Sequence, residues 1–266
     1  MNLSIPKIIR LIKRYALLAS PLKNKQCCIC NHKVGDFLAH AGGRKKAPQL
    51  MAALKMIGSD IDNFACPVCY AHDRERHQWL YWQAIGLLPR MQGAHILHFA
   101  PEHHLAQRIA AQQPAAYIKA DLYPNTDDIQ KVDLLQMPFA DEQFDFLIAN
   151  HVMEHVDNVS QALAEIRRVL KPSGWAILQT PYCATLQHTW EDAGIQSATQ
   201  RLAAYGQDDH VRLFGQDIFA IFEAAGFASQ CRAHAELLPD HCPTTYGVNR
   251  DEPYMVSTVN PKPINS

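Results

Sequence analysis

Apolar runs alternate with amphipathic stretches along much of the chain, most clearly in residues 133–181. An apolar run at 146–149 has the length of a buried strand and ends in a polar pair at 150–151. A helical pattern follows, ended by Lys171–Gly174, and a second apolar run covers 175–180. Strand, helix, tight stop and strand predict two neighbours in a parallel sheet. The ligand crevice of such a sheet lies at the carboxyl ends of its strands.

The preceding residues repeat this pattern. Two apolar runs, 95–100 and 117–120, are predicted strands on either side of a predicted helix at 105–112. Asp121 stands at the tip of the second of these strands. Strand pattern is then lost over 182–215, which predicts a cap that covers the crevice and selects the substrate.

The last part of the chain returns to regular structure. Residues 216–225 predict a helix, and 228–234 and 254–259 predict the last two strands. The tail 261–266 is expected to be loose. Strands that alternate with helices along the chain indicate the α/β class.

The amino-acid composition limits the classes of protein to which the chain can belong. The chain has 266 residues, 48% of them apolar, and a formal net charge of −1. It can therefore bury a full core. A net charge near zero gives no overall electrostatic attraction to nucleic acid or to an anionic membrane. No apolar run reaches the 18 residues of a transmembrane helix. Eight Cys in a mixed α/β chain without a convincing signal peptide favour the reducing cytoplasm.

Positive charge is concentrated in residues 1–25, where six Lys and Arg precede the first acid, Asp36. Apolar residues lie between them at nearly helical spacing, which predicts a basic amphipathic helix. Two interpretations stay open for this helix. It packs on the body of the protein, or it makes weak surface contact with an anionic membrane, RNA or a protein partner.

Two CxxC pairs, about 35 residues apart, have the spacing of a structural zinc ribbon. The predicted ligands are Cys27, Cys30, Cys66 and Cys69, with Cys28 as an alternative to Cys27. Four thiolates close the coordination sphere, so the metal would stabilise the fold and would not take part in catalysis. Ordinary buried cysteines are the alternative interpretation.

A dense polar turn, Arg74 to His77, follows the second CxxC pair. Arg74, Arg76 and His77 are candidates for contacts with an anionic substrate or a cofactor carboxylate. The alternative is a solvated charged turn in which Asp73 and Glu75 are the partners of the basic side chains.

Asp121 lies about 20 residues beyond the end of the first strand. Dinucleotide-type folds place there the carboxylate that accepts both ribose hydroxyls. However, the loop after the first strand reads Phe-Ala-Pro-Glu and contains no G-x-G-x-x-G. This argues against a diphosphate cofactor and favours a nucleoside without phosphates.

Four stretches carry a family resemblance: ILHFAPE, Ala120-Asp121, VDLLQMPFADEQFDFLIANHVMEHV and LAEIRRVLKPSGWAILQTP. Over about 95–259 the chain resembles class I S-adenosylmethionine-dependent methyltransferases of the methyltransferase type 11 group. The motifs CPVC, RERH, HFAPE, NHVMEHV and GQDDHVRLFG are similar to those of a bacterial subgroup within it. The resemblance implies a Rossmann-like sheet of seven mostly parallel strands, and S-adenosylmethionine as cofactor.

The resemblance also implies residue roles. Asp121 would bind the ribose, Asp133 with Leu134 the adenine, and Glu102 the amino group in place of the usual acid. The implied cofactor residues are Phe99, Ala100, Pro101, Glu102, Asp121, Leu122, Asp133, Leu134, Asn150 and His151. His98 stands where the family has that acid, and Ala100 and Glu102 stand where it has glycines.

Methyl transfer is an in-line displacement in which the enzyme orients its substrate and removes a proton. The catalytic candidates are His151, His210 and Arg212. His151, Glu154 and His155 form an H-x-x-E-H pattern, which we expect to start a helix in preference to binding a metal. The candidates for substrate contact are Arg74, Arg76, His77, Trp190, Glu191 and Asp209. The alternative for the polar residues after 206 is that Asp209 pairs with Arg212 and His210 caps a helix.

We therefore expect three regions: a basic helix at 1–25, a zinc ribbon with a connecting helix at 26–90, and a methyltransferase domain at 91–266 with its cap at about 182–215. The first functional hypothesis is an enzyme that methylates O or N of a small-molecule or glycan-like acceptor. The second is an RNA methyltransferase that uses the ribbon to recognise RNA. The third is a catalytically silent binding protein, favoured by the glycine-poor first loop. The oligomeric state stays open.

Overall fold

The computed structural model describes residues 5–259, and the tail 261–266, expected to be loose, lies outside them. The described residues divide into two compact units that interleave along the chain. The first contains 5–47, 59–85 and 233–252, and the second contains 48–58, 86–232 and 253–259. This division differs from the expected linear one because 233–252 belong with the cysteine-rich region and 48–58 with the large sheet.

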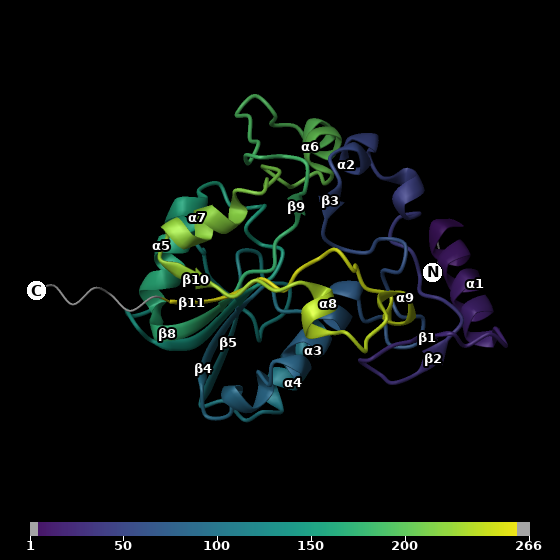
Figure 1. Ribbon diagram of the computed structural model, residues 1–266, viewed down its shortest axis with the longest axis horizontal. Helices are drawn as coiled ribbons and strands as arrows, with labels where there is room; N and C mark the ends of the chain where they lie inside the picture. The colour runs from purple at the N-terminus through teal and green to yellow at the C-terminus, as the bar shows by residue number, and fades with distance from the viewer. Residues whose placement is uncertain (1–4, 260–266) are drawn as a thin grey trace, which may run out of the picture. The chain divides into compact units, whose positions relative to one another are not determined.

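The second unit contains the large sheet and its helices (Figure 1). Its elements are α2 (Gln49–Ala53), β3 (Met56–Ile57), η2 (Leu88–Met91), β4 (His95–Phe99), α4 (His103–Ala110), β5 (Ala116–Asp121), β6 (Gln130–Lys131), β7 (Phe144–Ala149), α5 (Val159–Val169), β8 (Leu170–Ile177), β9 (Tyr182–Cys183), α6 (Ala198–Tyr205), α7 (Ile218–Ala224), β10 (Phe227–Ser229) and β11 (Val256–Val259).

Seven strands form the sheet in the order β10-β11-β8-β7-β4-β5-β6. β4 pairs in parallel with both β5 and β7, and β7 pairs in parallel with β8. β11 runs antiparallel to both of its neighbours. The expected fold class, a Rossmann-like and mostly parallel seven-stranded sheet, is confirmed. Chain order reverses direction between β4 and β7, so the topological switch point lies at their carboxyl ends.

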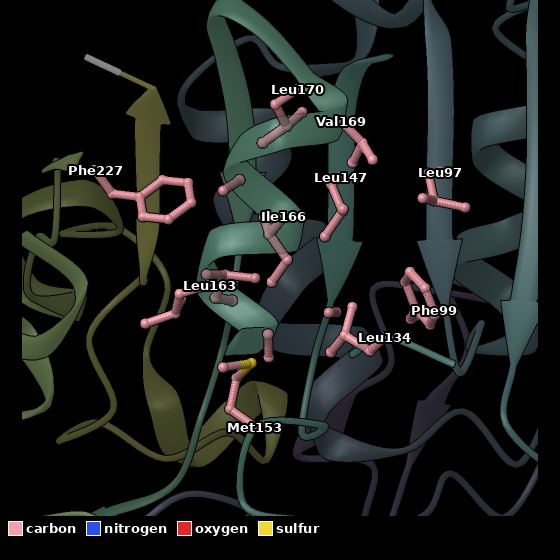
Figure 2. Close-up of a cluster of buried hydrophobic side chains, with 14 of the residues drawn as sticks. Leu97, Phe99, Leu134, Leu147, Met153, Leu163, Ile166, Val169, Leu170 and Phe227 are labelled. Carbon is pink, nitrogen blue, oxygen red and sulfur yellow. The ribbon is translucent and has the colours of Figure 1, made fainter. Parts of the chain in front are cut away.

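The core of this unit forms because β4 and β7 are buried on both faces and mainly apolar, as expected of parallel strands covered on both sides. Leu97 and Leu147 are partners in the β4–β7 register and are fully buried. Figure 2 shows Leu163 and Ile166 of α5 beside these strands. Each such side chain contributes about 1.5–3 kcal/mol on burial, which fixes the sheet that carries the site.

The helix of the predicted crossover begins later than expected. Residues 151–156 form turns, and α5 begins at Val159 after the N-cap Asn158, whose side chain accepts a hydrogen bond from Gln161 N at 3.0 Å. The expectation that the H-x-x-E-H pattern starts a helix is therefore wrong. β8 also begins earlier, at Leu170, with a register shift opposite Phe144 and Phe146. α5 and α7 lie side by side near β8 and β10 (Figure 1).

The predicted cap at 182–215 contains little regular structure. Its first residues form β9, which pairs with β3, and its helix α6 contacts α2. Figure 1 shows α6 beside α2, although they are far apart in sequence. Trp190 pairs with Leu213, and this bridge closes the segment on itself.

The first unit contains shorter elements. They are α1 (Ile5–Ala19), β1 (Lys25–Gln26), β2 (Lys33–Val34), η1 (Arg44–Lys46), α3 (Asp73–Ala84), α8 (His234–Leu237) and α9 (Pro243–Tyr246). The prediction of a strand through residue 234 is wrong. β10 ends at Ser229, and His234 begins α8. The ring of His234 is buried, and its Nδ1 lies 2.8 Å from Nε2 of His77.

The predicted N-terminal helix is present as α1. Ile12 and Tyr15 on this helix are 63% and 60% exposed. Within residues 5–259, no helix combines the length and hydropathy that a membrane crossing requires.

Candidate functional site

Polar side chains meet at the switch point, where β4 and β7 end. Glu102, in the loop after β4, accepts a hydrogen bond from Asn150 Nδ2 at 3.2 Å through Oε1. Its other oxygen, Oε2, lies 3.0 Å from His98 Nε2. Asn150 is 4% exposed, and its Oδ1 is buried without a hydrogen-bond partner among the described residues. The carboxylate of Glu102 therefore joins the two strand ends at the edge where the crevice is expected.

The loop after β4 is held in an unusual backbone conformation. Ala100 has φ of 45°, in the left-handed region that favours glycine, and its N–H donates to Ala120 O at 2.8 Å. The loop thus adopts a glycine-like conformation without glycine. Phe99 is buried before it, and Pro101 is half-buried after it.

His98 is built into the sheet below this loop. Its Nδ1 lies 2.9 Å from Tyr117 Oη, on the neighbouring strand β5. Burial, together with the negative charge of Glu102, raises the pKa of Tyr117 well above its ordinary value, so the phenol stays a hydrogen-bond donor. Tyr117 donates to His98 Nδ1, which leaves His98 Nε2–H to donate to Glu102. This chain fixes the orientation of the Glu102 carboxylate.

Two exposed turns follow β5 and β6 along the same edge. Asp121 Oδ1 accepts from Tyr123 N at 2.8 Å, and Asp133 Oδ1 accepts from Leu135 N at 2.8 Å. Each turn thereby fixes its carboxylate through Oδ1. Leu122 is 43% exposed, whereas Leu134 is buried.

The loop after β7 carries a cluster of titratable groups around Glu154. Glu154 is 1% exposed. Its Oε1 lies 3.5 Å from His151 Nδ1 and 3.9 Å from His210 Nε2. The ring of His155 stands edge-on to that of His210, with centroids 4.7 Å apart. His151 has φ of 53°, and its N–H donates to Gln179 O at 2.7 Å.

Charge states in this cluster follow from its burial. Burial raises the pKa of Glu154, but the imidazoles of His151, His210 and His155 oppose it more strongly, and the net pKa lies below its ordinary value. Burial lowers the pKa of His210, against the attraction of Glu154, so this ring is neutral at pH 7. Glu154 is thus a buried carboxylate bordered by imidazoles.

Arg212, expected to be a catalytic residue, has a positioning role in the structure. Its Nη1 donates to Met153 O at 3.2 Å and also to Val156 O, and its Nη2 donates to Asp157 O at 3.2 Å. Its Nε donates to Glu191 Oε2 at 2.9 Å. The alternative pairing of Arg212 with Asp209 is not the one observed. Arg212 therefore holds the loop that carries Glu154, and Glu191 balances its charge.

The other cap residues have separate surroundings. Trp190 is 36% exposed, and its ring contacts Tyr205 at a centroid distance of 5.4 Å. Asp209 is exposed, and its Oδ2 lies 3.4 Å from His155 Nδ1. His210 is fully buried, and its Nδ1 lies 3.2 Å from Tyr205 O. The cap thus brings His210 and Asp209 to the loop after β7.

Arg76, another expected substrate contact, is fully buried in the first unit. Its guanidinium donates to five main-chain carbonyls, those of Asn63, Phe64, Ala71, Tyr246 and Gly247. All five donors are used within the protein, so Arg76 has a structural role in place of the expected substrate contact.

His77 is likewise buried, with Nδ1 2.9 Å from Glu252 and Nε2 2.8 Å from His234, so both of its ring nitrogens are engaged. Arg74 is half-buried, and its Nε is buried without a hydrogen-bond partner among the described residues. Glu75 accepts from His72 N at 2.8 Å and caps α3. The solvated-turn alternative is also wrong, because Asp73, Glu75 and Arg76 are all buried.

The expected cysteine ligands come together in the first unit. One sulfur from each of Cys27, Cys30, Cys66 and Cys69 lies within 4.8 Å of the others. The Sγ atoms of Cys27 and Cys69 are 3.7 Å apart, and those of Cys30 and Cys66 are 3.9 Å apart. Tetrahedral zinc–thiolate geometry separates sulfurs by about 3.8 Å, so the four thiols fit the ion. Cys28 lies outside the set, with Sγ 3.4 Å from Arg76 O.

Sequence reasoning did not name Glu154 and His155 among the site residues. The available signal was three titratable side chains, His151, Glu154 and His155, within six residues of the end of β7. The spacing of that pattern predicts a helix start, but the structure has turns there.

Residues 93–178 match the sequence model of a methyltransferase domain family. An uncharacterised 37.1 kDa protein of a Streptomyces fradiae transposon is 30% identical over 103 residues, which cover 38% of this chain and 29% of that protein. A ubiquinone/menaquinone biosynthesis C-methyltransferase of Desulfotalea psychrophila is 43% identical over 47 residues, 18% of this chain and 19% of that protein. The matched stretches thus span less than a third of those relatives' lengths.

Solved structures are similar in fold at low identity. A putative methyltransferase from Bacillus halodurans is 15% identical with a TM-score of 0.43, over 68% of this chain and 99% of that chain. An S-adenosylmethionine-dependent methyltransferase from Mesorhizobium loti is 14% identical with a TM-score of 0.44, over 67% of this chain and 96% of that chain. The family match at 93–178 supports methyl transfer as the general activity of the sheet-containing unit.

Proposed function

We propose that the chain is an S-adenosylmethionine-dependent methyltransferase that acts on O or N of a small-molecule or glycan-like acceptor. The observation that carries the proposal is the switch point between β4 and β7, where Glu102 and Asn150 meet. It lies within the residues that match the methyltransferase domain. An open α/β sheet binds its ligand at this place.

The residues along this edge suit a nucleoside with a charged amino-acid end. Asp121 Oδ2 can accept the ribose hydroxyls, and the exposed Leu122 can cover one face of the sugar. Asp133 can accept from the adenine amine while Leu134 forms an apolar floor. Glu102 supplies a fixed carboxylate for the ammonium group. The bound cofactor would supply an activated methyl group.

The acceptor side is proposed from the loop after β7 and from the cap. Asn150 Oδ1 is buried and free to accept a hydrogen bond from a ligand donor. His151 follows it in the chain and can hold a proton at Nε2, an atom that is buried without a hydrogen-bond partner in the described part of the chain. Trp190 and Asp209, both exposed on the cap, are candidates for contact with the acceptor.

For the first unit we propose one structural zinc ion bound by Cys27, Cys30, Cys66 and Cys69. The support is the near-tetrahedral sulfur spacing and the scarcity of regular structure between 25 and 47. Zinc binding contributes about 10–16 kcal/mol in comparable modules, enough to order such a segment.

Calorimetric titration with S-adenosylhomocysteine tests the cofactor site. We expect saturable binding, weakened about 10- to 100-fold in Asp121→Ala, because hydrogen bonds to a charged acceptor contribute about 1.5–3 kcal/mol. Asp133→Ala should act in the same direction. Asp240→Ala changes an exposed carboxylate of the first unit and is the matched control. Absence of binding by the wild-type protein would refute the proposed function, and unchanged affinity in both variants would refute the residue assignment.

A further inference from the structure

The cluster after β7 has the composition and spacing of a metal site. One ligand atom from each of Glu154, His155 and His210 lies within 4.8 Å of the others. His151 Nδ1 lies 3.5 Å from Glu154 Oε1. An ion about 2.1 Å from each ligand holds neighbouring ligand atoms about 3–3.5 Å apart, so small side-chain rotations would close the set.

Buried polar atoms in this cluster lack hydrogen-bond partners. Both carboxylate oxygens of Glu154 and the Nε2 atoms of His151 and His210 are buried without one in the described part of the chain. A buried carboxylate in this state costs several kcal/mol unless a cation compensates it. Glu154 Oε1 lies 3.9 Å from His210 Nε2, so a single cation between these two segments would compensate the carboxylate and the unpartnered imidazole nitrogen.

The local tautomer of His210 also suits a metal ligand. Its Nδ1 lies 3.2 Å from Tyr205 O, a carbonyl that can only accept, so Nδ1 carries the proton. Nε2 then presents its lone pair toward Glu154. Metal-binding histidines commonly donate their second nitrogen to a carbonyl in this way.

The backbone around the cluster is fixed by contacts that do not involve the ligands' own side chains. Arg212 holds the carbonyls of Met153, Val156 and Asp157. Val211 N donates to Glu154 O at 3.0 Å, which joins the cap to the loop after β7. Because the ligand-bearing segments are preorganised in this way, binding an ion requires little rearrangement.

We propose that Glu154, His155 and His210, with Nδ1 of His151 as a fourth ligand atom, bind one divalent transition-metal ion. Imidazole and carboxylate donors favour Mn²⁺, Fe²⁺, Co²⁺ or Zn²⁺, whereas Mg²⁺ and Ca²⁺ prefer oxygen alone. The site is distinct from the four-thiolate set of the first unit.

The position of the ion has a consequence that rests on the proposed function. His151 directly follows Asn150 at the carboxyl end of β7, so the ion would lie on the acceptor side of the methyl-transfer site. A bound divalent ion lowers the pKa of a hydroxyl that it coordinates. The acceptor group that fits is therefore a hydroxyl, and the chain would be an O-methyltransferase.

Titration with Mn²⁺, followed by electron paramagnetic resonance on the full chain, tests the site. Mn²⁺ prefers nitrogen and oxygen donors, so it reports this site in preference to the thiolates. We expect one equivalent per chain, and an affinity at least about tenfold weaker in Glu154→Gln and in His155→Ala. Even the removal of a residue that hydrogen-bonds to a metal ligand lowers metal affinity about 10- to 100-fold.

Two controls keep the result interpretable. His188→Ala changes a histidine that is 89% exposed, and it should leave Mn²⁺ binding unchanged. Circular dichroism on each variant separates loss of the ligand from loss of the fold, and the wild-type stoichiometry gives a result without any variant. No saturable Mn²⁺ binding by wild type, or unchanged affinity in both folded variants, would overturn the metal site.

Titration of the same protein with S-adenosylhomocysteine separates the two proposals. Mn²⁺ binding without S-adenosylhomocysteine binding supports the metal site and refutes the proposed methyl transfer. S-adenosylhomocysteine binding without Mn²⁺ binding refutes the metal site and supports the proposed methyl transfer.

Discussion

Replacement of Arg76 by Lys should lower the stability of the first unit and speed its amide hydrogen exchange. The guanidinium lies 3.9 Å from the centroid of the Phe37 ring and donates to five main-chain carbonyls. These carbonyls come from two segments, 63–71 and 246–247, so the side chain joins parts of the unit that are distant in sequence. Lysine keeps the charge but carries three donors on one atom and lacks the planar fork.

The magnitude follows from the carbonyls that lose their partner. At least two of the five remain without a donor in Arg76→Lys. Each buried carbonyl left unpaired costs about 1–3 kcal/mol, so we expect a loss of about 2–6 kcal/mol. A loss of about 3 kcal/mol corresponds to amide exchange roughly 100-fold faster in the segments that Arg76 joins.

Hydrogen exchange followed by mass spectrometry measures the rate of amide exchange directly, on peptides that cover 63–77 and 243–250. Arg44→Lys is the control, because Arg44 is 67% exposed and its pair with Asp62, at 3.5 Å, contributes little. If Arg76→Lys exchanged within threefold of wild type in both segments, the structural role of Arg76 would be refuted. A substrate contact, the role expected from sequence, would instead weaken acceptor binding and leave exchange unchanged.

Three further changes test other parts of the description. Cys66→Ser should release one equivalent of zinc to a chromogenic chelator, whereas Cys242→Ser, an exposed cysteine outside the cluster, should retain it; equal zinc content in both variants would refute the ligand set. Burial raises the pKa of Asp73 from 3.8 to about 6. The folded state therefore binds more protons than the unfolded state, and stability falls as pH rises from about 4 to 6. Asp73→Asn should flatten that slope and gain up to about 3 kcal/mol at pH 7 in urea unfolding, and a slope equal to that of wild type would contradict the assignment. Asn158→Ala should cost about 1 kcal/mol by the same measurement through loss of the cap on α5, and a change below about 0.3 kcal/mol would show that the cap contributes little.

The strands of the large sheet were predictable because their pattern is local. β4 and β7 are buried on both faces, so each appears in the sequence as a short, mainly apolar run, and β7 is followed directly by the polar pair Asn150 and His151. Asp121 follows from the same reasoning, whereas Asp133 follows the exposed strand β6 and its role was implied by the family resemblance. The boundaries of α5 and β8 were missed, because the polar loop 151–157 has a helix-like spacing and β8 begins opposite an irregular register.

The roles of the basic side chains were not predictable, because they depend on partners distant in the chain. Arg76 is a structural donor only because residues 246–247, 170 and 171 positions away, turn their carbonyls toward it. Arg212 is a catalytic candidate in the sequence, but its donors are used by carbonyls of the loop after β7.

The sequence by itself determined the strand and helix pattern of the sheet, the polar residues at its strand ends and the two CxxC pairs, because side-chain periodicity and ligand spacing are local properties. Tertiary structure alone decided that Cys27 and not Cys28 joins the other thiols. It also decided that Glu154 meets His210, since burial and the meeting of separate segments depend on packing across the fold. Because of the same packing, residues 151–155 do not start a helix as expected, and the carboxylate of Glu154 is buried beside imidazole rings.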